Sequence, residues 1–153
     1  MPIQTQQKTN SLIGQLMING ITVSPLKEIE VAGGNVLHIL KKTDQSFKNF
    51  GEAYFSFVNH GAIKAWKMHY KMTLNLVVPL GNVKFVFIDN KNNFNEITAG
   101  TSNYVRITVE PMIWFGFMGL EKGQSLILNI GNIIHDPNEI KKAALEDFKY
   151  NWS

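Results

Sequence analysis

The sequence predicts a mainly β protein, built as a sandwich or barrel of short strands. Short runs rich in Val, Ile, Leu, Phe and Tyr recur along the chain, as is typical of β-strands. Clusters of Gly, Pro, Asn and Asp separate them and indicate turns. Many short strands at such spacing favour a sandwich or a barrel. The expected strands are residues 36–40, 53–58, 73–78, 83–88, 104–109 and 125–130.

Turn-forming residues bound most of the expected strands. Two glycines, Gly33 and Gly34, precede the strand at 36–40, and the sequence Asn-His-Gly at 59–61 follows the strand at 53–58. Pro-Leu-Gly-Asn at 79–82 separates the next two strands, and the polar run at 89–93 ends the second of them. Glu-Lys-Gly-Gln at 121–124 precedes the last strand. We therefore expect antiparallel connections through short turns.

The C-terminal segment, residues 136–150, is the one stretch that reads as a helix. Asp136 is a suitable N-cap, Pro137 takes the first helical position, and Glu139 stands where a capping-box acid belongs. Apolar residues then recur at helical spacing, at Ile140, Ala144 and Phe148. The whole chain, 1–153, is expected to be a single domain, with residues 1–20 as an N-terminal arm.

Composition excludes several classes of protein. The 153 residues include no cysteine, so disulfides, thiolate metal sites and a cysteine nucleophile are ruled out. No apolar run reaches the roughly 20 residues of a membrane helix, and the N-terminus has no signal-peptide core, so we expect a cytoplasmic protein. The net charge of +3 suits an anionic small molecule. No basic run stands out, which argues against a nucleic-acid partner.

The most informative segment runs from residue 61 to residue 81. It contains Lys64, Trp66, Lys67 and His69 and continues as an apolar strand. Such a cationic and aromatic cluster predicts the wall of a pocket for an anionic ligand, and the alternative is a solvated strand end. Strand alternation places Lys67 and His69 on one face, with Lys64 and Trp66 on the other unless a bulge intervenes.

Two amides stand in otherwise apolar strands. Asn75 lies in the strand at 73–78 and Asn129 in the strand at 125–130. A buried amide needs a hydrogen-bond partner, so each is expected to contact either a ligand or the surrounding wall of the barrel.

The segment Gly61-Ala-Ile-Lys-Ala-Trp-Lys-Met-His69 resembles a known family pattern, Gly-Val-Leu-Arg-Gly-x-His, often with a second histidine two places on. A later segment, Val109-Glu-Pro-Met-Ile-Trp-Phe-Gly-Phe117, is similar to Pro-Pro-Gly-x-x-His-Gly-Phe. Both patterns belong to the cupins that include dTDP-4-dehydrorhamnose 3,5-epimerases and nucleotide-sugar 3,4-ketoisomerases. The resemblance covers about residues 21–137.

The resemblance implies a fold and an activity. The fold would be a cupin-type double-stranded β-helix (a jelly-roll barrel), usually a homodimer with its substrate inside the barrel. The activity would be epimerisation or isomerisation of a nucleotide-linked 4-keto-6-deoxy sugar, without metal or other cofactor, in the synthesis of bacterial surface polysaccharides. The alternative is a non-catalytic cupin that binds a sugar or nucleotide sugar, because the epimerase base histidine falls on Lys67 and its tyrosine acid has no counterpart in residues 127–134.

The resemblance also suggests roles for the catalytic candidates. His69, at the second histidine position, would be the base. Lys67 would act either as a second base, if its pKa is depressed, or as a cation that stabilises the enolate. Tyr54, in Glu52-Ala-Tyr-Phe-Ser, would be the acid or a donor to the carbonyl. Lys64, at the family arginine, would bind the diphosphate.

The remaining candidates have weaker support. Trp66 and Trp114 would stack on a base or sugar, or else pack in the core. His38 falls where the family often has an acidic pocket residue and would be a second acid or base. No metal is expected, because Lys67 and Phe115 stand where metal-binding cupins have histidines.

Overall fold

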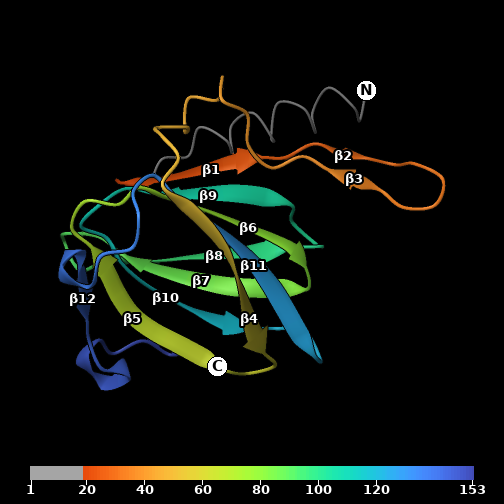
Figure 1. Cartoon of the computed structure of the whole chain (residues 1–153). Helices are drawn as coiled ribbons and strands as arrows, with labels where there is room; N and C mark the ends of the chain where they lie inside the picture. Colours follow the sequence, from red (N-terminus) through yellow and green to blue (C-terminus); the bar gives the residue numbers. More distant parts are fainter. Residues whose placement is uncertain (1–18) are drawn as a thin grey trace, which may run out of the picture.

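The computed structural model describes residues 19–153 and confirms a mainly β fold (Figure 1). It contains two five-stranded antiparallel sheets and one two-stranded hairpin. The predicted N-terminal arm, residues 1–20, lies outside the described residues except for its last two positions. No helix among the described residues is long and apolar enough to span a membrane.

The first sheet has the strand order β1-β9-β6-β11-β4, and β4 is one of its edges. Its strands are β1 (Ile21–Pro25), β9 (Val105–Val109), β6 (Leu74–Leu80), β11 (Gln124–Gly131) and β4 (Glu52–Asn59). The second sheet has the order β12-β5-β10-β7-β8. Its strands are β12 (Ile140–Lys142), β5 (Ile63–His69), β10 (Trp114–Gly119), β7 (Asn82–Ile88) and β8 (Phe94–Gly100). The hairpin consists of β2 (Glu28–Ile29) and β3 (Val36–Leu37).

The main hydrophobic core lies between the two sheets. Leu74, Leu76 and Ile107 of the first sheet pack in one cluster with Phe85 and Phe87 of the second. Successive side chains of a strand point to opposite faces, so the even-numbered residues of β7 point away from this core. They enter a second cluster, which the C-terminal segment covers. Strand β7 therefore reads as a continuous apolar run because both of its faces are buried.

All six strands expected from the sequence are present, but β1, β2, β8, β10 and β12 were not predicted. Strand β10 was missed because its glycines read as turn residues. A Cβ atom at Gly116 would come within 2.4 Å of the Cβ of Ala65 on the neighbouring strand β5. Gly116 is therefore required for close approach of the two backbones within a strand, and not for a turn.

The structure corrects the expected C-terminal α-helix over residues 136–150. Asp136 does cap a helical turn, since its side chain accepts a hydrogen bond from the Asn138 N–H, but the turn is a 3₁₀ helix of three residues, Pro137–Glu139. Ile140 is already extended, and β12 pairs with the edge of β5. A second 3₁₀ turn follows at Leu145–Asp147. The backbone partners offered by β5 outweigh the weak helical preference of so short a segment.

The end of the chain seals the second cluster. Trp152 is 8% exposed, and its ring lies 5.4 Å from that of Trp66 and 5.0 Å from that of Tyr150. Its carbonyl accepts a hydrogen bond of 2.8 Å from the buried Lys84 ammonium. The last residues of the chain are therefore part of the folded core.

We expect Trp152→Ala to lower the free energy of unfolding by about 3–5 kcal/mol, because it removes a buried indole and leaves a cavity. Urea unfolding followed by circular dichroism measures the change. The neighbouring exposed Ser153→Ala is the matched control and should leave the midpoint unchanged. A loss below about 1 kcal/mol for Trp152→Ala would show that the C-terminal segment does not stabilise the fold.

Candidate active site

A bulge in β5 places Lys64 and Lys67 on the same face. Lys67 pairs with Phe115 of β10 and Lys64 pairs with Phe117, so two residues of β5 stand opposite the single residue Gly116. Directly paired residues share a face of the sheet, and the rings of Phe115 and Phe117 pack in the main core. The structure therefore corrects the alternation expected for Lys64, since the extra residue at the bulge turns its side chain to the inner face.

The two lysines line a cavity of about 330 Å³ between the sheets. Phe115 and Phe117 form an apolar wall, Ser56 of β4 faces them from the other sheet, and Lys142 of β12 supplies a third cation. No carboxylate of the described chain lines this cavity. Three cations against an aromatic wall favour an anionic ligand that also carries an apolar or carbohydrate face.

Lys67 is the most enclosed of the three lysines. Its Nζ lies 5.5 Å from the centroid of the Phe115 ring. Burial lowers the pKa of Lys67, and the charges of Lys142 and Lys64 lower it further, while Glu139 opposes the shift. The ammonium is therefore easier to deprotonate than a lysine in water.

His69 and Glu139 form a buried pair at the far end of β5 from Lys64, and neither residue lines the cavity. His69 Nδ1 lies 2.5 Å from Glu139 Oε1, and each residue is 4% exposed. The other oxygen of Glu139 accepts hydrogen bonds of 3.1 Å and 3.2 Å from the N–H groups of Lys71 and Met72. The His69 ring stacks on that of Phe115, at 6.5 Å between centroids. His69 and Lys67 thus contact the same aromatic ring.

The protonation state of the pair follows from its surroundings. Burial lowers the pKa of His69 below its usual 6.5, and the hydrogen bond that His69 donates to Glu139 only partly offsets this. Burial alone raises the pKa of Glu139, but the hydrogen bonds from His69 and from two backbone N–H groups outweigh it and lower that pKa. At neutral pH the pair is therefore a neutral imidazole and a carboxylate, with Nδ1–H donating to Glu139.

This tautomer leaves His69 Nε2 with a free lone pair. Nε2 is buried and has no hydrogen-bond partner in the part of the chain that the structure describes. A buried imidazole nitrogen without a partner, held in one tautomer by a carboxylate, is well suited to accept a proton from a ligand.

Glu139 was not recognised as a site residue from the sequence. It lies 70 positions after His69 and was assigned to a helix cap. Only the pairing of β12 with β5, with Ile140 opposite His69, brings the carboxylate to the imidazole. The sequence contains one hint that Glu139 is buried, because it precedes an apolar residue in a segment rich in lysines. The helix-capping pattern explains an acidic residue at this position equally well.

Tyr54 and Asn129 lie on the facing sheet with Ser56, but neither is among the residues that line the cavity, and Tyr54 is 38% exposed. Tyr54 is two residues from Ser56 and so points to the same side of β4. Burial, followed by the charge of Glu52, raises the pKa of Tyr54, which keeps its phenol protonated. Asn129 donates to Ser56 Oγ at 3.0 Å and to the Tyr54 carbonyl at 3.3 Å. Its amide thus holds β4 in place and is already partnered.

The two predicted indole rings lie on the other face of the sheet, although Trp66 is among the residues that line the cavity. The Trp66 ring packs on Phe148 and Trp152 on the outer face of the second sheet, and its Nε1–H donates to the Leu145 carbonyl. The Trp114 ring packs beside it, 5.3 Å from Phe148. Both indoles therefore fill the second cluster, on the far side of the sheet from Lys67.

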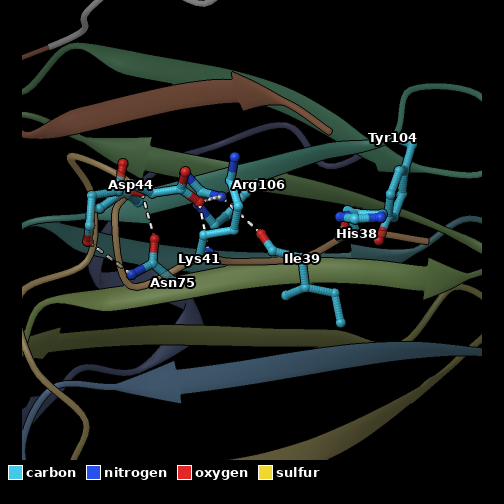
Figure 2. A network of polar contacts seen from close by, with 9 residues as sticks. His38, Ile39, Lys41, Asp44, Asn75, Tyr104 and Arg106 are labelled. Atoms are coloured by element: carbon cyan, nitrogen blue, oxygen red, sulfur yellow. Dashed lines mark hydrogen bonds and ion pairs between the residues drawn. The ribbon is translucent and has the colours of Figure 1, made fainter. Parts of the chain in front are cut away.

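Asn75 and His38 belong to the outer side of the first sheet (Figure 2). Asn75 donates to the Ser46 carbonyl and accepts a 2.6 Å hydrogen bond from Thr108. His38 is exposed, and its carbonyl accepts from the Tyr104 hydroxyl. The structure does not bring either side chain together with His69.

Within residues 19–153, no group of three His, Asp or Glu side chains is arranged to hold a metal ion. The absence of a cofactor remains a prediction.

Comparison with known proteins places the fold. No protein-family model matches the chain, and no curated protein is similar to it in sequence. Among solved structures, a sugar 3,4-ketoisomerase from Thermoanaerobacterium thermosaccharolyticum in complex with TDP superposes with a TM-score of 0.72, at 17% identity over 86% of this chain and 93% of that one. A dTDP-4-dehydrorhamnose 3,5-epimerase from Sulfolobus tokodaii gives a TM-score of 0.76, at 16% identity over 88% and 82%.

One solved structure is also similar in sequence. A dTDP sugar isomerase from Desulfovibrio desulfuricans is 32% identical in sequence to this chain. The alignment covers 88% of this chain and 92% of the isomerase, with a TM-score of 0.84. Identity at this level over nearly the whole of both chains is evidence of common descent. The chain therefore belongs to the family of nucleotide-sugar epimerases and isomerases that its Gly61–His69 segment resembles.

Proposed function

We propose that this protein epimerises or isomerises a nucleotide-linked keto sugar by moving a proton on a carbon beside the carbonyl. The observation that carries the proposal is the buried His69–Glu139 pair with its unpartnered Nε2, whose imidazole packs on Phe115, a residue that lines the cationic cavity. The activities of its structural relatives, a dTDP sugar isomerase and a sugar 3,4-ketoisomerase, support the same reaction class.

His69 acts as the base in this proposal. A C–H group beside a ketone is a weak acid, so the base must be neutral at the working pH and aimed at the substrate. Burial keeps the pKa of His69 low enough for the neutral form, and Glu139 stabilises the imidazolium that forms when the proton is taken. Glu139 is therefore a positioning residue.

Tyr54 returns the proton. It lies on β4 of the first sheet, whereas His69 lies on β5 of the second. A sugar ring bound between the sheets would meet the base on one face and the acid on the other, which is the arrangement that inversion at carbon requires. The raised pKa of Tyr54 keeps its proton available.

Lys64 and Lys142 bind the diphosphate of the nucleotide, at the open side of the cavity. Both lysines are exposed residues, and Lys64 Nζ donates a 2.8 Å hydrogen bond to the Phe57 carbonyl, which orients it. Each acts as a point charge, since a lysine lacks the paired donors of an arginine.

We expect Lys64→Met to raise KM for the nucleotide sugar and Kd for dTDP by about 10-fold to 100-fold, since it removes one charge-assisted hydrogen bond, and to change kcat little. Calorimetric titration with dTDP and steady-state kinetics measure the two effects. The control is Lys122→Met, an exposed lysine outside this cavity, which should match the unmodified protein. A fall in kcat with unchanged Kd would place Lys64 in the chemistry instead.

The finer assignments belong to the same proposal. The sugar would be a 4-keto-6-deoxy hexose, made in the cytoplasm for a bacterial surface polysaccharide. The protein would be a homodimer, because edge strand β4 exposes Phe55 at 61% and Phe57 at 57%, which a second copy would cover.

The test is proton NMR in deuterium oxide with dTDP-4-keto-6-deoxyglucose. We expect deuterium to enter beside the carbonyl, and the labelled carbon separates 3-epimerisation or 3,4-ketoisomerisation from 3,5-epimerisation. If the nucleotide sugar binds without exchange above the buffer rate, the chain is the non-catalytic sugar-binding cupin.

A further inference from the structure

The only arginine of this chain is buried outside the candidate active site. Arg106 of β9 is 4% exposed, and its neighbour Ile107 packs in the main core between the sheets. Successive side chains of a strand point to opposite faces, so Arg106 points to the outer side of the first sheet. Burial of a cation costs free energy unless other groups compensate its charge. The contacts of Arg106 therefore show whether it has all the partners that a buried cation needs.

The guanidinium of Arg106 uses only one of its edges. Both of the hydrogen bonds that it makes within the described chain start from Nη1, which donates to the Ile39 carbonyl at 2.7 Å and to Asp44 Oδ2 at 3.3 Å. Nε is buried and has no partner among residues 19–153. Burial lowers the pKa of Arg106, and Asp44 offsets this only in part. The Nε–H and the adjacent Nη2–H are parallel donors, which match two oxygens of one carboxylate or phosphate.

A cavity of about 500 Å³ lies on this face of the sheet, and Arg106 lines it. The segment from His38 to Ser46 supplies much of the cavity wall. Hydrogen bonds hold this segment on the sheet at both ends, since the Tyr104 hydroxyl donates to the His38 carbonyl and the Asn75 amide to the Ser46 carbonyl (Figure 2). The wall is therefore fixed by contacts within the chain that need no ligand.

The charges that line this cavity favour a dianion. Lys27 and Lys41 are exposed lysines that line it together with Arg106. Asp44 is the one carboxylate among its lining residues in the described chain, and it already binds Arg106 and, at 2.8 Å, the Lys41 N–H. Three cations against one carboxylate leave two positive charges. A phosphate monoester carries nearly two negative charges at neutral pH and offers three acceptor oxygens.

We propose that this cavity binds a small phosphate monoester, such as a sugar phosphate. Two phosphoryl oxygens accept the Nε–H and Nη2–H of Arg106, and Lys27 and Lys41 balance the remaining charge at the rim. The cavity is larger than a phosphate ion needs, which leaves room for the esterified group. The inference is independent of the proposed function, since this cavity shares no residue with the one that Lys64 lines and lies on the opposite face of the first sheet.

The test is NMR of the full chain labelled with nitrogen-15. Because Arg106 is the only arginine, its Nε–H gives one resonance that needs no variant for its assignment. We expect glucose 1-phosphate to move this proton downfield in a saturable manner and to slow its exchange with water, since the N–H gains an acceptor. Inorganic phosphate should cause the same shift at higher concentration, and succinate, a dicarboxylate, should cause little.

Three variants locate the bound anion. Lys41→Met should raise the Kd for glucose 1-phosphate about 10-fold, because it removes one of the charges at the rim. Lys42→Met is the matched control, an exposed neighbour that does not line this cavity, and should leave the Kd unchanged. Lys64→Met alters only the cavity between the sheets and should leave both the Kd and the shift of the Arg106 Nε–H unchanged.

Four results would overturn the proposal. If neither phosphate compound moves the Nε–H resonance at saturating concentration, Arg106 only holds residues 39–44 on the sheet. If succinate moves the resonance and glucose 1-phosphate does not, the ligand is not a phosphate ester. A response to inorganic phosphate alone excludes the ester in the same way. Loss of the shift in Lys64→Met would mean that the anion binds between the sheets.

Discussion

His69→Asn should reduce deuterium entry beside the ketone by about 10³-fold, the range expected when a general base is removed. The substitution takes away Nε2, which is buried and unpartnered in the described chain, on a ring that packs against Phe115 of the cationic cavity. Binding of dTDP should change less than threefold, because Lys64 and the aromatic wall are unaltered. The measurement is exchange followed by NMR at saturating nucleotide sugar, with a calorimetric titration for binding.

Asparagine is chosen because its amide can still donate to Glu139. A side chain without a donor would leave the buried carboxylate with only the Lys71 and Met72 N–H groups. Breaking a buried pair in this way costs about 3–5 kcal/mol and would confuse loss of chemistry with loss of the fold. His60→Asn is the matched control, since His60 is an exposed histidine that contacts the Glu121 carbonyl. Exchange within tenfold of the unmodified protein for His69→Asn would remove His69 from the role of base.

The strands could be predicted from the sequence because local pattern decides them. Strands β4, β6, β7 and β11 carry runs of Val, Ile, Leu and Phe between turn residues, and each appears where it was expected. Strand β1 alternates Ile and Val with Thr and Ser, which is the pattern of a half-buried strand, and it was nevertheless missed. The local pattern fails where a neighbouring strand decides the residue type, as at Gly116, which lacks a Cβ atom because Ala65 of β5 lies too close.

The site could be predicted only in part, because two of its features come from the pairing of strands. The position of Lys64 depends on a bulge opposite Gly116, and no residue of β5 announces a bulge. The contact between His69 and Glu139 depends on β12 joining the edge of β5. The residue types in the sequence were enough to select His69 and Lys67 as candidates. Their neighbours Glu139 and Lys64 could be recognised only from the fold.

The second large effect concerns Glu139. Glu139→Gln keeps the volume of the side chain and leaves an oxygen that can still accept from Nδ1–H. It removes the negative charge that stabilises the imidazolium formed during proton transfer. We expect deuterium entry to fall by about 10²-fold, with little change in dTDP binding.

The pH profile shows whether Glu139 acts through His69. Deuterium entry needs neutral His69, so the rate falls as the pH drops through the pKa of His69, which lies below the usual 6.5. The hydrogen bond and the charge of Glu139 both raise that pKa, whereas burial lowers it. Glutamine keeps a hydrogen-bond acceptor but removes the charge that raises the pKa of His69, so the acid limb of Glu139→Gln should move to lower pH. Glu146→Gln, an exposed acid of the same C-terminal segment, is the control and should keep the original limb.

If the exchange rate of Glu139→Gln falls but the acid limb of its pH profile does not move, Glu139 only supports the backbone at Lys71 and Met72. It accepts hydrogen bonds from the N–H groups of both residues. If the acid limb moves to lower pH and the rate also falls, the carboxylate acts through the protonation of His69. A purely structural role cannot lower the pKa of the base while binding of dTDP is preserved. The direction of the shift is therefore more informative than the size of the rate loss.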